Sequence, residues 1–413
     1  MKQLLYSLLF IFVISLSAIG QGPVKVELPE VEGAHFDRNR LLFPGDSLAM
    51  ERFFDKLDTL LRTGEGRVNI LHIGGSHVQA GVFSQQMRDH LLNLAPGLTA
   101  GRGLVFPFMK TNTPASLVIT RNGEWDYSRN AVPFSTRMGL AGASVATSDT
   151  AASFCILTRE KNPRDITPLF DFNLVKILGY GDMAPVVHFN HDTLYGRYNK
   201  AEGSYTFHLP AYTDSLYVDF NGLNGTFTVT GVYLDNGMPG ITYHDIGVNG
   251  AKVESYLSCE DFERDLRLVR PDLVIFGIGI NDAASDTFTK EKFINDYNDL
   301  IRLIHKVSPD CALLFITNND SYKRVKKNKY EVNPNGTVAR EAFLTLGKQH
   351  NGAVWDFFDI MGGLRSMADW QDHGLAQKDK VHFTNAGYTL IGDLLYNALM
   401  DRYLEHLKNT CRP

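Results

Sequence analysis

Four polar residues, at three distant places in the chain, carry the functional groups that acyl transfer requires. Ser76 directly follows two glycines, and Asp379 and His382 lie three residues apart near the carboxyl end. A serine hydroxyl becomes a good nucleophile only when a base accepts its proton, and a histidine base needs a carboxylate that fixes its tautomer. Asn281, in a Gly-Ile-Asn-Asp segment, carries an amide that can donate to a developing oxyanion. These residues predict a Ser-His-Asp nucleophilic site.

Each of these residues is expected near the carboxyl end of a strand. Strand-like and helical segments alternate on both sides of a central region, which is typical of a parallel sheet covered by helices. Ligands bind such sheets at the carboxyl ends of the strands. Each motif alone is common in turns. The prediction of a catalytic site therefore depends on all of them occurring together, each after a strand. The expected strands are 68–73, 273–277, 312–317 and 353–357, and the expected helices are 47–62, 83–94, 259–269, 293–307, 338–349 and a long one beginning near Thr384.

The central region, about residues 112–242, has a different texture. Short runs rich in Thr, Tyr, Phe and Val alternate there with Asn, Gly and Asp, which predicts closely spaced antiparallel strands. Asn224-Gly225 stands between two such runs, 216–220 and 226–234, and predicts a two-residue hairpin. We therefore expect an inserted all-β domain with a sandwich or jelly-roll-like fold.

The composition and the amino-terminal sequence indicate in which cellular compartment the protein acts. The chain has 413 residues, of which 44% are hydrophobic and 21% charged, as in an ordinary globular protein. Its net charge of −5 does not indicate binding to nucleic acid. A basic start, an apolar run over 4–18 and small residues at Ala18 and Gly20 predict a signal peptide that is cleaved after Gly20. The run is too short to span a bilayer, and no later run of 18 apolar residues occurs, so we expect no membrane insertion after cleavage. Export to the periplasm or beyond is expected, where the four cysteines could pair in ways that the sequence leaves open.

The order of the motifs resembles that of the SGNH hydrolases, also called GDSL esterases. The family's first block matches Ile73 to His77 and implies that Ser76 is the nucleophile, and its second block's glycine matches Gly250. The Gly-x-Asn-Asp block assigns Asn281, and the Asp-x-x-His block assigns Asp379 and His382. One residue departs from the pattern, because Gly75 stands where the family has Asp.

The resemblance implies a flavodoxin-like three-layer α/β sandwich and a serine carboxylic ester hydrolase without cofactor. The backbone amides of Ser76 and Gly250 and the side chain of Asn281 would form the oxyanion hole. The inserted region resembles the carbohydrate-binding-type module of some bacterial envelope members, which implies an O-acetylated glycan such as peptidoglycan as substrate. Two alternatives stay open: an O-acetyltransferase with the same triad, and a catalytically weakened glycan-binding protein, as Gly75 suggests. An α/β-hydrolase fits less well, since Val78 stands where Gly-x-Ser-x-Gly requires glycine.

The resulting domain organisation is discontinuous. We expect a signal peptide over 1–20, the first part of the α/β domain over 21–111, the β insertion over 112–242 and the second part of the α/β domain over 243–413. Both ends of the mature chain would therefore build one domain. The oligomeric state stays open.

Three further residues are weaker candidates for substrate contact: His77, Arg102 and Lys326. Lys326 belongs to a basic run from Lys323 to Lys329, which is expected as a solvated loop or, more sharply, as a loop that overhangs the site and touches an anionic glycan. His188 and His191 form a His-x-x-His pair, but without a third ligand in view no metal site is predicted.

Overall fold

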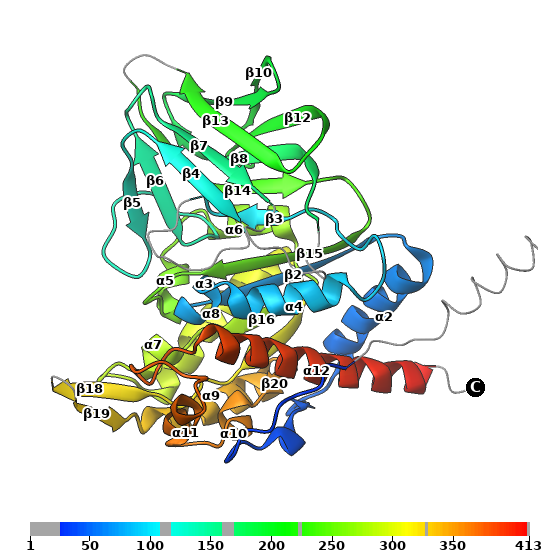
Figure 1. The fold of residues 1–413 in the computed structure, drawn as a ribbon, viewed down its shortest axis with the longest axis vertical. Helices are drawn as coiled ribbons and strands as arrows, with labels where there is room; N and C mark the ends of the chain where they lie inside the picture. The colour runs from blue at the N-terminus through cyan, green and yellow to red at the C-terminus, as the bar shows by residue number, and fades with distance from the viewer. Residues whose placement is uncertain (1–24, 108–116, 159–168, 222–224, 327–328, 411–413) are drawn as a thin grey trace, which may run out of the picture.

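The computed structural model describes residues 25–107, 117–158, 169–221, 225–326 and 329–410 (Figure 1). The predicted signal peptide over residues 1–20 lies outside these ranges. Within them, no helix combines the length and the hydropathy that crossing a bilayer requires.

The predicted parallel sheet is confirmed and has six strands. Its order is β1 (Leu41–Leu42), β20 (Ala353–Trp355), β17 (Ala312–Ile316), β16 (Leu273–Gly277), β2 (Arg67–Gly74) and β15 (Gly240–Gly247). All neighbours pair in parallel except β1, which runs antiparallel to β20. The carboxyl ends of β2 and β16 therefore lie side by side at one edge of the sheet.

Helices cover both faces of this sheet, which gives the predicted three layers (Figure 1). Side chains alternate along each strand, so that Ile70 of β2 packs into one apolar core and Leu71 into the other. The first core is closed by α2 (Leu48–Thr63), α4 (Val82–Leu92) and α12 (Asn385–Thr410). The second is closed by α5 (Val253–Leu257), α6 (Phe262–Val269), α8 (Lys290–Val307) and α9 (Asn335–Gln349).

One predicted helix is wrong in its bounds. The segment 259–269 was expected to be a single helix, but α5 ends at Leu257 and α6 begins only at Phe262. Between them the Asp261 amide donates to the Met138 carbonyl, 3.0 Å away, instead of continuing a helix. The remaining short helices of the described chain are η1 (Phe36–Arg38), α3 (Ser76–Gln79), α7 (Ile280–Ala283), α10 (Phe357–Ile360) and α11 (Ser366–Asp372).

The inserted region forms two antiparallel sheets around its own apolar core. One has the order β10 (Asp192–Tyr195), β9 (Ala184–Phe189), β13 (Ser215–Asn221), β7 (Ser153–Leu157) and β4 (Val118–Asn122). The other has the order β11 (Arg197–Asn199), β12 (Ser204–Thr213), β8 (Phe172–Gly181), β14 (Phe227–Asp235), β6 (Ala143–Thr147) and β5 (Asp126–Arg129), with β3 (Gly103–Val105) also on β14. Phe154, Val218 and Phe227 pack in the core. The predicted β insertion is confirmed.

The hairpin predicted at Asn224-Gly225 is wrong. Asn224 lies outside the described residues, but the strands on either side are β13 and β14, which belong to different sheets. β13 pairs with β7 and β9, whereas β14 pairs with β3, β6 and β8. The chain therefore crosses from one sheet to the other, and apolar packing in the shared core decides its partner strands.

The sheets also suggest slightly different limits for the insertion. β3 pairs with β14 in the insertion, although residues 103–105 were assigned to the α/β domain, and β15 starts at Gly240 in the parallel sheet. We therefore propose an insertion over about residues 103–239. It sits against the outer edge of β15 (Figure 1), where the Leu104 amide donates to His244 Nδ1 at 3.0 Å. Just before the insertion, the Leu98 carbonyl accepts from the Ile241 amide at 2.6 Å.

The basic run that was expected as a loop is instead a two-stranded hairpin. It consists of β18 (Tyr322–Lys326) and β19 (Lys329–Val332), which pair antiparallel and project from the α/β domain (Figure 1). The Asn333 amide donates to the Ser321 carbonyl at 2.8 Å and closes its base. This backbone pairing explains why a charged segment forms strands.

Candidate active site

Ser76 lies where β2 ends and α3 begins. The turn before it is held tightly, because the Gly74 carbonyl accepts from Tyr256 Oη at 2.9 Å and from the Val248 amide at 3.3 Å. A Cβ at Gly74 would come within 2.2 Å of Val78 Cγ2, so only glycine fits there. The start of α3 thus presents the Ser76 hydroxyl at the carboxyl edge of the sheet.

Asp379 and His382 lie together in the loop before α12. One carboxylate oxygen of Asp379, Oδ1, accepts from the backbone amides of Val381 and His382, both at 3.0 Å. Its other oxygen, Oδ2, lies 2.7 Å from His382 Nδ1. Between them Lys380 adopts φ +55°, a left-handed conformation that turns the loop tightly. One turn therefore orients both side chains.

The histidine connects this loop to the serine. His382 Nε2 lies 2.8 Å from Ser76 Oγ, so the structure joins all three predicted side chains in one chain of hydrogen bonds. With a proton on Nδ1 shared with Asp379, the lone pair of Nε2 faces the hydroxyl; this tautomer is inferred from the hydrogen-bond partners. The arrangement can deprotonate the Ser76 hydroxyl.

The charge state of Asp379 suits this arrangement. Burial alone would favour the neutral acid, but the hydrogen bond with the His382 side chain and those from the His382 and Val381 amides outweigh it. The pKa of Asp379 is consequently lowered to about 2. A permanent carboxylate can stabilise the imidazolium that forms when His382 accepts a proton.

Asn281 and Gly250 lie beside the Ser76 turn. Asn281 is on α7, which follows β16, the neighbour of β2 in the sheet. Its Nδ2 donates one hydrogen to the Ala251 carbonyl at 2.9 Å. The second hydrogen of that amide stays available for a ligand. A Cβ at Gly75 would lie 3.3 Å from Asn281 Nδ2, so a side chain there would press on this donor. In the described chain the Ser76 and Gly250 amides have no hydrogen-bond acceptor, as oxyanion donors require.

Asp282 is a supporting residue that the sequence reasoning missed. Its carboxylate is buried and accepts from the Val253 amide, at 3.3 and 3.4 Å, where α5 begins just after Gly250-Ala251. Burial raises its pKa to about 7, although the hydrogen bond from Val253 opposes the shift. Asp282 thereby ties the Gly250 loop to α7. Its position in the Gly-x-Asn-Asp segment was the only sequence signal for it.

His77 lies beside the triad but points into the protein. Its Nδ1 lies 2.8 Å from Tyr388 Oη, and its ring centre is 5.4 Å from that of His382. Burial, followed by repulsion from His382, lowers the pKa of His77 to about 3, so the ring is neutral. This position favours support of His382 over the predicted contact with substrate.

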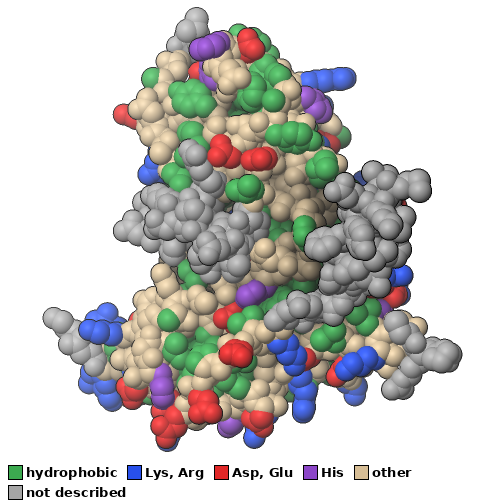
Figure 2. Space-filling model, turned by 45° about the vertical axis from the view of Figure 1, so that its right-hand side comes forward, with side chains coloured by type: hydrophobic (Ala, Val, Ile, Leu, Met, Phe, Trp, Pro, Cys, Tyr) green, Lys and Arg blue, Asp and Glu red, His purple; other side chains and the backbone are tan. Residues whose placement is uncertain are grey.

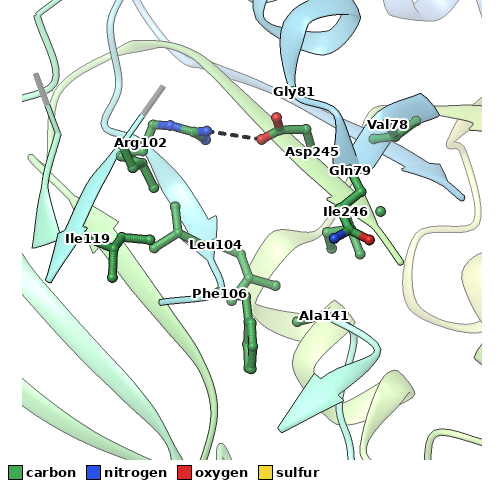
Figure 3. A pocket seen from close by; sticks show the side chains of 13 residues that line it. Val78, Gln79, Gly81, Arg102, Leu104, Phe106, Ile119, Ala141, Asp245 and Ile246 are labelled. Atoms are coloured by element: carbon green, nitrogen blue, oxygen red, sulfur yellow. Dashed lines mark hydrogen bonds and ion pairs between the residues drawn. The ribbon is translucent and has the colours of Figure 1, made fainter. Parts of the chain in front are cut away.

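Arg102 is not brought to the triad. It is 4% exposed and pairs with Asp245 at 3.1 Å, and burial, with the nearby Arg88, lowers its pKa to about 10. Figure 3 shows this pair at a pocket of about 60 Å³ between the insertion and the α/β domain. The pocket is lined by Val78 and Gln79 of α3, by Ile246 of β15 and by Leu104, Phe106 and Ile119 of the insertion.

Lys326 and the histidine pair have no contact with the triad. Lys326 is exposed at the end of β18. His188 Nε2 lies 2.7 Å from Asp219 Oδ2, and the described residues contain no group of three His, Cys, Asp or Glu that could hold a metal. The described cysteines, Cys155, Cys259 and Cys311, are free thiols, and Cys411 lies outside the described residues.

A family model matches the carboxyl-terminal part of the chain. Residues 212–390, which include Asn281, Asp379 and His382 but not Ser76, match the model of the GDSL-like lipase/acylhydrolase family. Over these residues the chain is similar to a GDSL-like acylhydrolase domain. The predicted resemblance and the predicted enzyme class, a carboxylic ester hydrolase, are thereby confirmed.

One solved structure extends the likeness to most of the fold. A structure described as a peptidoglycan O-acetylesterase in action is 21% identical, with a TM-score of 0.73, and the match covers 88% of this chain and 99% of that one. A putative GDSL-like lipase from Parabacteroides merdae is 22% identical with a TM-score of 0.31, covering 39% and 74% of the two chains. A family two carbohydrate esterase from Cellvibrio japonicus is 10% identical with a TM-score of 0.27, covering 70% and 100%. No curated protein matches the sequence.

Proposed function

We propose that the protein is a serine esterase that removes acyl groups, O-acetyl above all, from a carbohydrate. The observation that carries this proposal is the chain of contacts from Ser76 Oγ to His382 Nε2 at 2.8 Å and from His382 Nδ1 to Asp379 Oδ2 at 2.7 Å. A nucleophile, a base and an orienting carboxylate in this order suffice for acyl transfer.

The reaction would proceed through an acyl-enzyme. Ser76 Oγ attacks the ester carbonyl while His382 Nε2 takes its proton, and Asp379 stabilises the resulting imidazolium. The amides of Ser76 and Gly250 and the free hydrogen of Asn281 Nδ2 bind the oxyanion. The intermediate collapses when His382 protonates the leaving alcohol. A water molecule, deprotonated by His382, then attacks the acyl-enzyme and releases the acid.

The carbohydrate part of the proposal rests on likeness. A peptidoglycan O-acetylesterase shares the fold over almost its whole length, including the region of the β insertion. Peptidoglycan, or another acetylated polysaccharide, is therefore the substrate class we propose. The apolar run at residues 4–18 supports an exported enzyme that meets this polymer in the bacterial envelope.

Gly75 leaves the weakened, glycan-binding alternative open to test. The turn beside it keeps Ser76 within hydrogen-bonding distance of His382 without the family's aspartate, which favours an active enzyme. An acetyltransferase would use the same triad and differ only in the acceptor that resolves the acyl-enzyme.

The test is hydrolysis of p-nitrophenyl acetate and of acetylated peptidoglycan by the purified protein and by Ser76→Ala. We expect nitrophenol and acetate release from the parent protein only. No release from a folded parent protein would refute the esterase proposal. Release that depends on added glycan, with acetyl appearing on that glycan, would instead identify a transferase.

A further inference from the structure

The β18–β19 hairpin is attached to both halves of the candidate active site. At the start of β18, the Tyr322 amide donates to the carbonyl of Lys380, in the loop between Asp379 and His382, at 3.1 Å. After β19, Asn333 Nδ2 donates to the Ala283 carbonyl, two residues beyond Asn281, at 3.0 Å. The hairpin therefore rises between the loop that carries the base and the helix that carries the oxyanion donor.

The side chains of the hairpin leave positive charge unneutralised. Arg324 and Lys326 are exposed and have no ion-pair partner among the residues that the structure describes. Lys323 does have one, since its Nζ lies 3.2 Å from Asp286 Oδ1, and Lys329 lies 2.7 Å from Glu331. Figure 2 shows Lys and Arg side chains gathered at the lower left, where the hairpin projects.

Arg324 lies on the face of the hairpin that meets the loop between Asp379 and His382. Side chains alternate along a strand, so Arg324 shares a face with Tyr322. The ring of Tyr322 contacts that loop, since Lys380 Nζ lies 4.7 Å from its centre. Arg324 and Lys380 thus add charge to the same side of the hairpin. A small cationic surface beside an ester site complements an anionic substrate, and the chain as a whole, at net −5, does not favour polyanions in general.

We propose that the β18–β19 hairpin is a substrate-binding arm that holds the carboxylates of an acidic glycan while a neighbouring ester group reaches Ser76. This inference rests on the proposed function and narrows its substrate class to carboxylate-bearing polysaccharides. Arg324 is the principal contact, because its planar guanidinium can bind a carboxylate through two parallel hydrogen bonds. Lys326 extends the charged surface outward along the polymer.

The test uses the Arg324→Glu/Lys326→Glu double variant of the full chain. Its KM is measured on acetylated polygalacturonate, which is acidic, and on acetylated xylan without acidic substituents, which is neutral. We expect the ratio of the acidic to the neutral KM to rise about tenfold, because each reversed charge replaces an attraction to the substrate by a repulsion. Arg324→Gln/Lys326→Gln should give a smaller rise. Added salt should raise the acidic KM of the parent protein.

The matched control is Lys348→Glu/Lys408→Glu, which reverses the same charge on exposed lysines near the carboxyl ends of α9 and α12. The arm is refuted if this control raises the KM ratio as much as the hairpin variant does. It is equally refuted if the hairpin variant changes both substrates alike.

Binding separates this inference from the proposed esterase activity. The affinity for de-esterified polygalacturonate is measured in the Ser76→Ala background, where no turnover is needed. Loss of affinity on reversing Arg324 and Lys326 would support the arm even if the parent protein hydrolysed no ester. Equal affinity for single-stranded DNA would refute recognition of a glycan.

Discussion

Replacing Asp379 by Asn separates the chemical role of the carboxylate from its structural role. Asparagine keeps a carbonyl oxygen where Oδ1 accepts the amides of Val381 and His382, so the loop can keep its turn. Its NH₂ group, however, takes the place of Oδ2, 2.7 Å from His382 Nδ1. A donor there forces Nδ1 to accept, and the proton of the neutral ring moves to Nε2, toward Ser76.

The expected loss follows from this change of tautomer. A ring that carries its proton on Nε2 cannot take one from Ser76 Oγ, 2.8 Å away. The same exchange in a Ser-His-Asp triad lowers kcat by about 10⁴, which corresponds to about 5–6 kcal/mol of transition-state stabilisation. We expect a kcat loss of that size on p-nitrophenyl acetate, with KM changed little.

Stability should respond far less. The lowered pKa of Asp379 means that its carboxylate stabilises the fold above about pH 4, and that this contribution is lost as the pH falls toward 2. Because the side chain is 41% exposed, we discount the contribution to about 1 kcal/mol. Urea unfolding at pH 7 should show a loss of this size for Asp379→Asn. Asp379→Ala should lose more, since it abandons both backbone amides.

The comparison of the two variants is decisive. An Asp379→Asn protein that keeps more than about a tenth of the parent kcat would refute the assignment of Asp379 as the residue that fixes the tautomer of His382. The assignment would also be refuted if the loss of kcat only reflected unfolding. In that case the Asn and Ala variants would lose activity in proportion to their unfolded fraction, and the folded fraction of each would keep the parent kcat.

Three more predictions concern the neighbours of the triad. Asn281→Ala should lower kcat on p-nitrophenyl acetate about 10²–10³-fold with little change in KM, and an unchanged kcat would remove Asn281 from the oxyanion hole. His77→Phe should reduce the free energy of unfolding in urea by about 1–3 kcal/mol, because Tyr388 Oη, 2.8 Å from His77 Nδ1, loses its partner in a buried site. Asp282→Asn should flatten the pH dependence of stability. In the parent protein the pKa of Asp282 is raised from 3.8 to about 7, so the folded state keeps a proton that the unfolded chain has already lost. The free energy of unfolding therefore falls as the pH rises from about 4 to 7, by as much as about 4 kcal/mol.

The part of the site that the sequence could predict is the part set by local geometry. Ser76 and Asn281 each follow a strand, and neighbouring parallel strands bring their carboxyl ends together. Asp379 and His382 are three residues apart in a turn, so their contact also depends on short-range structure. Arg102 shows the limit of such reasoning. Its partner Asp245 is 143 residues away, on β15, which follows the insertion in the chain.

The fold follows the same division. Four of the six strands and the six longest helices of the α/β part could be predicted because their hydrophobic periodicity is strong, whereas β1 and β15 were missed. The Asn224-Gly225 motif misled because a turn signal is local, whereas packing in the shared core decides whether the next strand pairs back or crosses to the facing sheet. The basic hairpin was not predicted because a run of exposed charged residues does not favour strands. Hydrogen bonds between backbone groups at its base nevertheless hold the two segments as a pair of strands.

The packing of the insertion beside β15 affects how readily the α/β domain can aggregate. A long outer strand with free backbone groups is a template on which other chains can pair and aggregate. The opposite edge of the parallel sheet ends in β1, only two residues long, while the eight residues of β15 would offer a far longer template. The segment leading into the insertion pairs with this edge at Ile241, which exchanges backbone hydrogen bonds with Leu98 and Ala100, and the Leu104 amide of β3 donates to the side chain of His244. The insertion packs beside the same strand through β3, so we expect a domain trimmed of residues 98–239 to expose the β15 edge and to aggregate more readily.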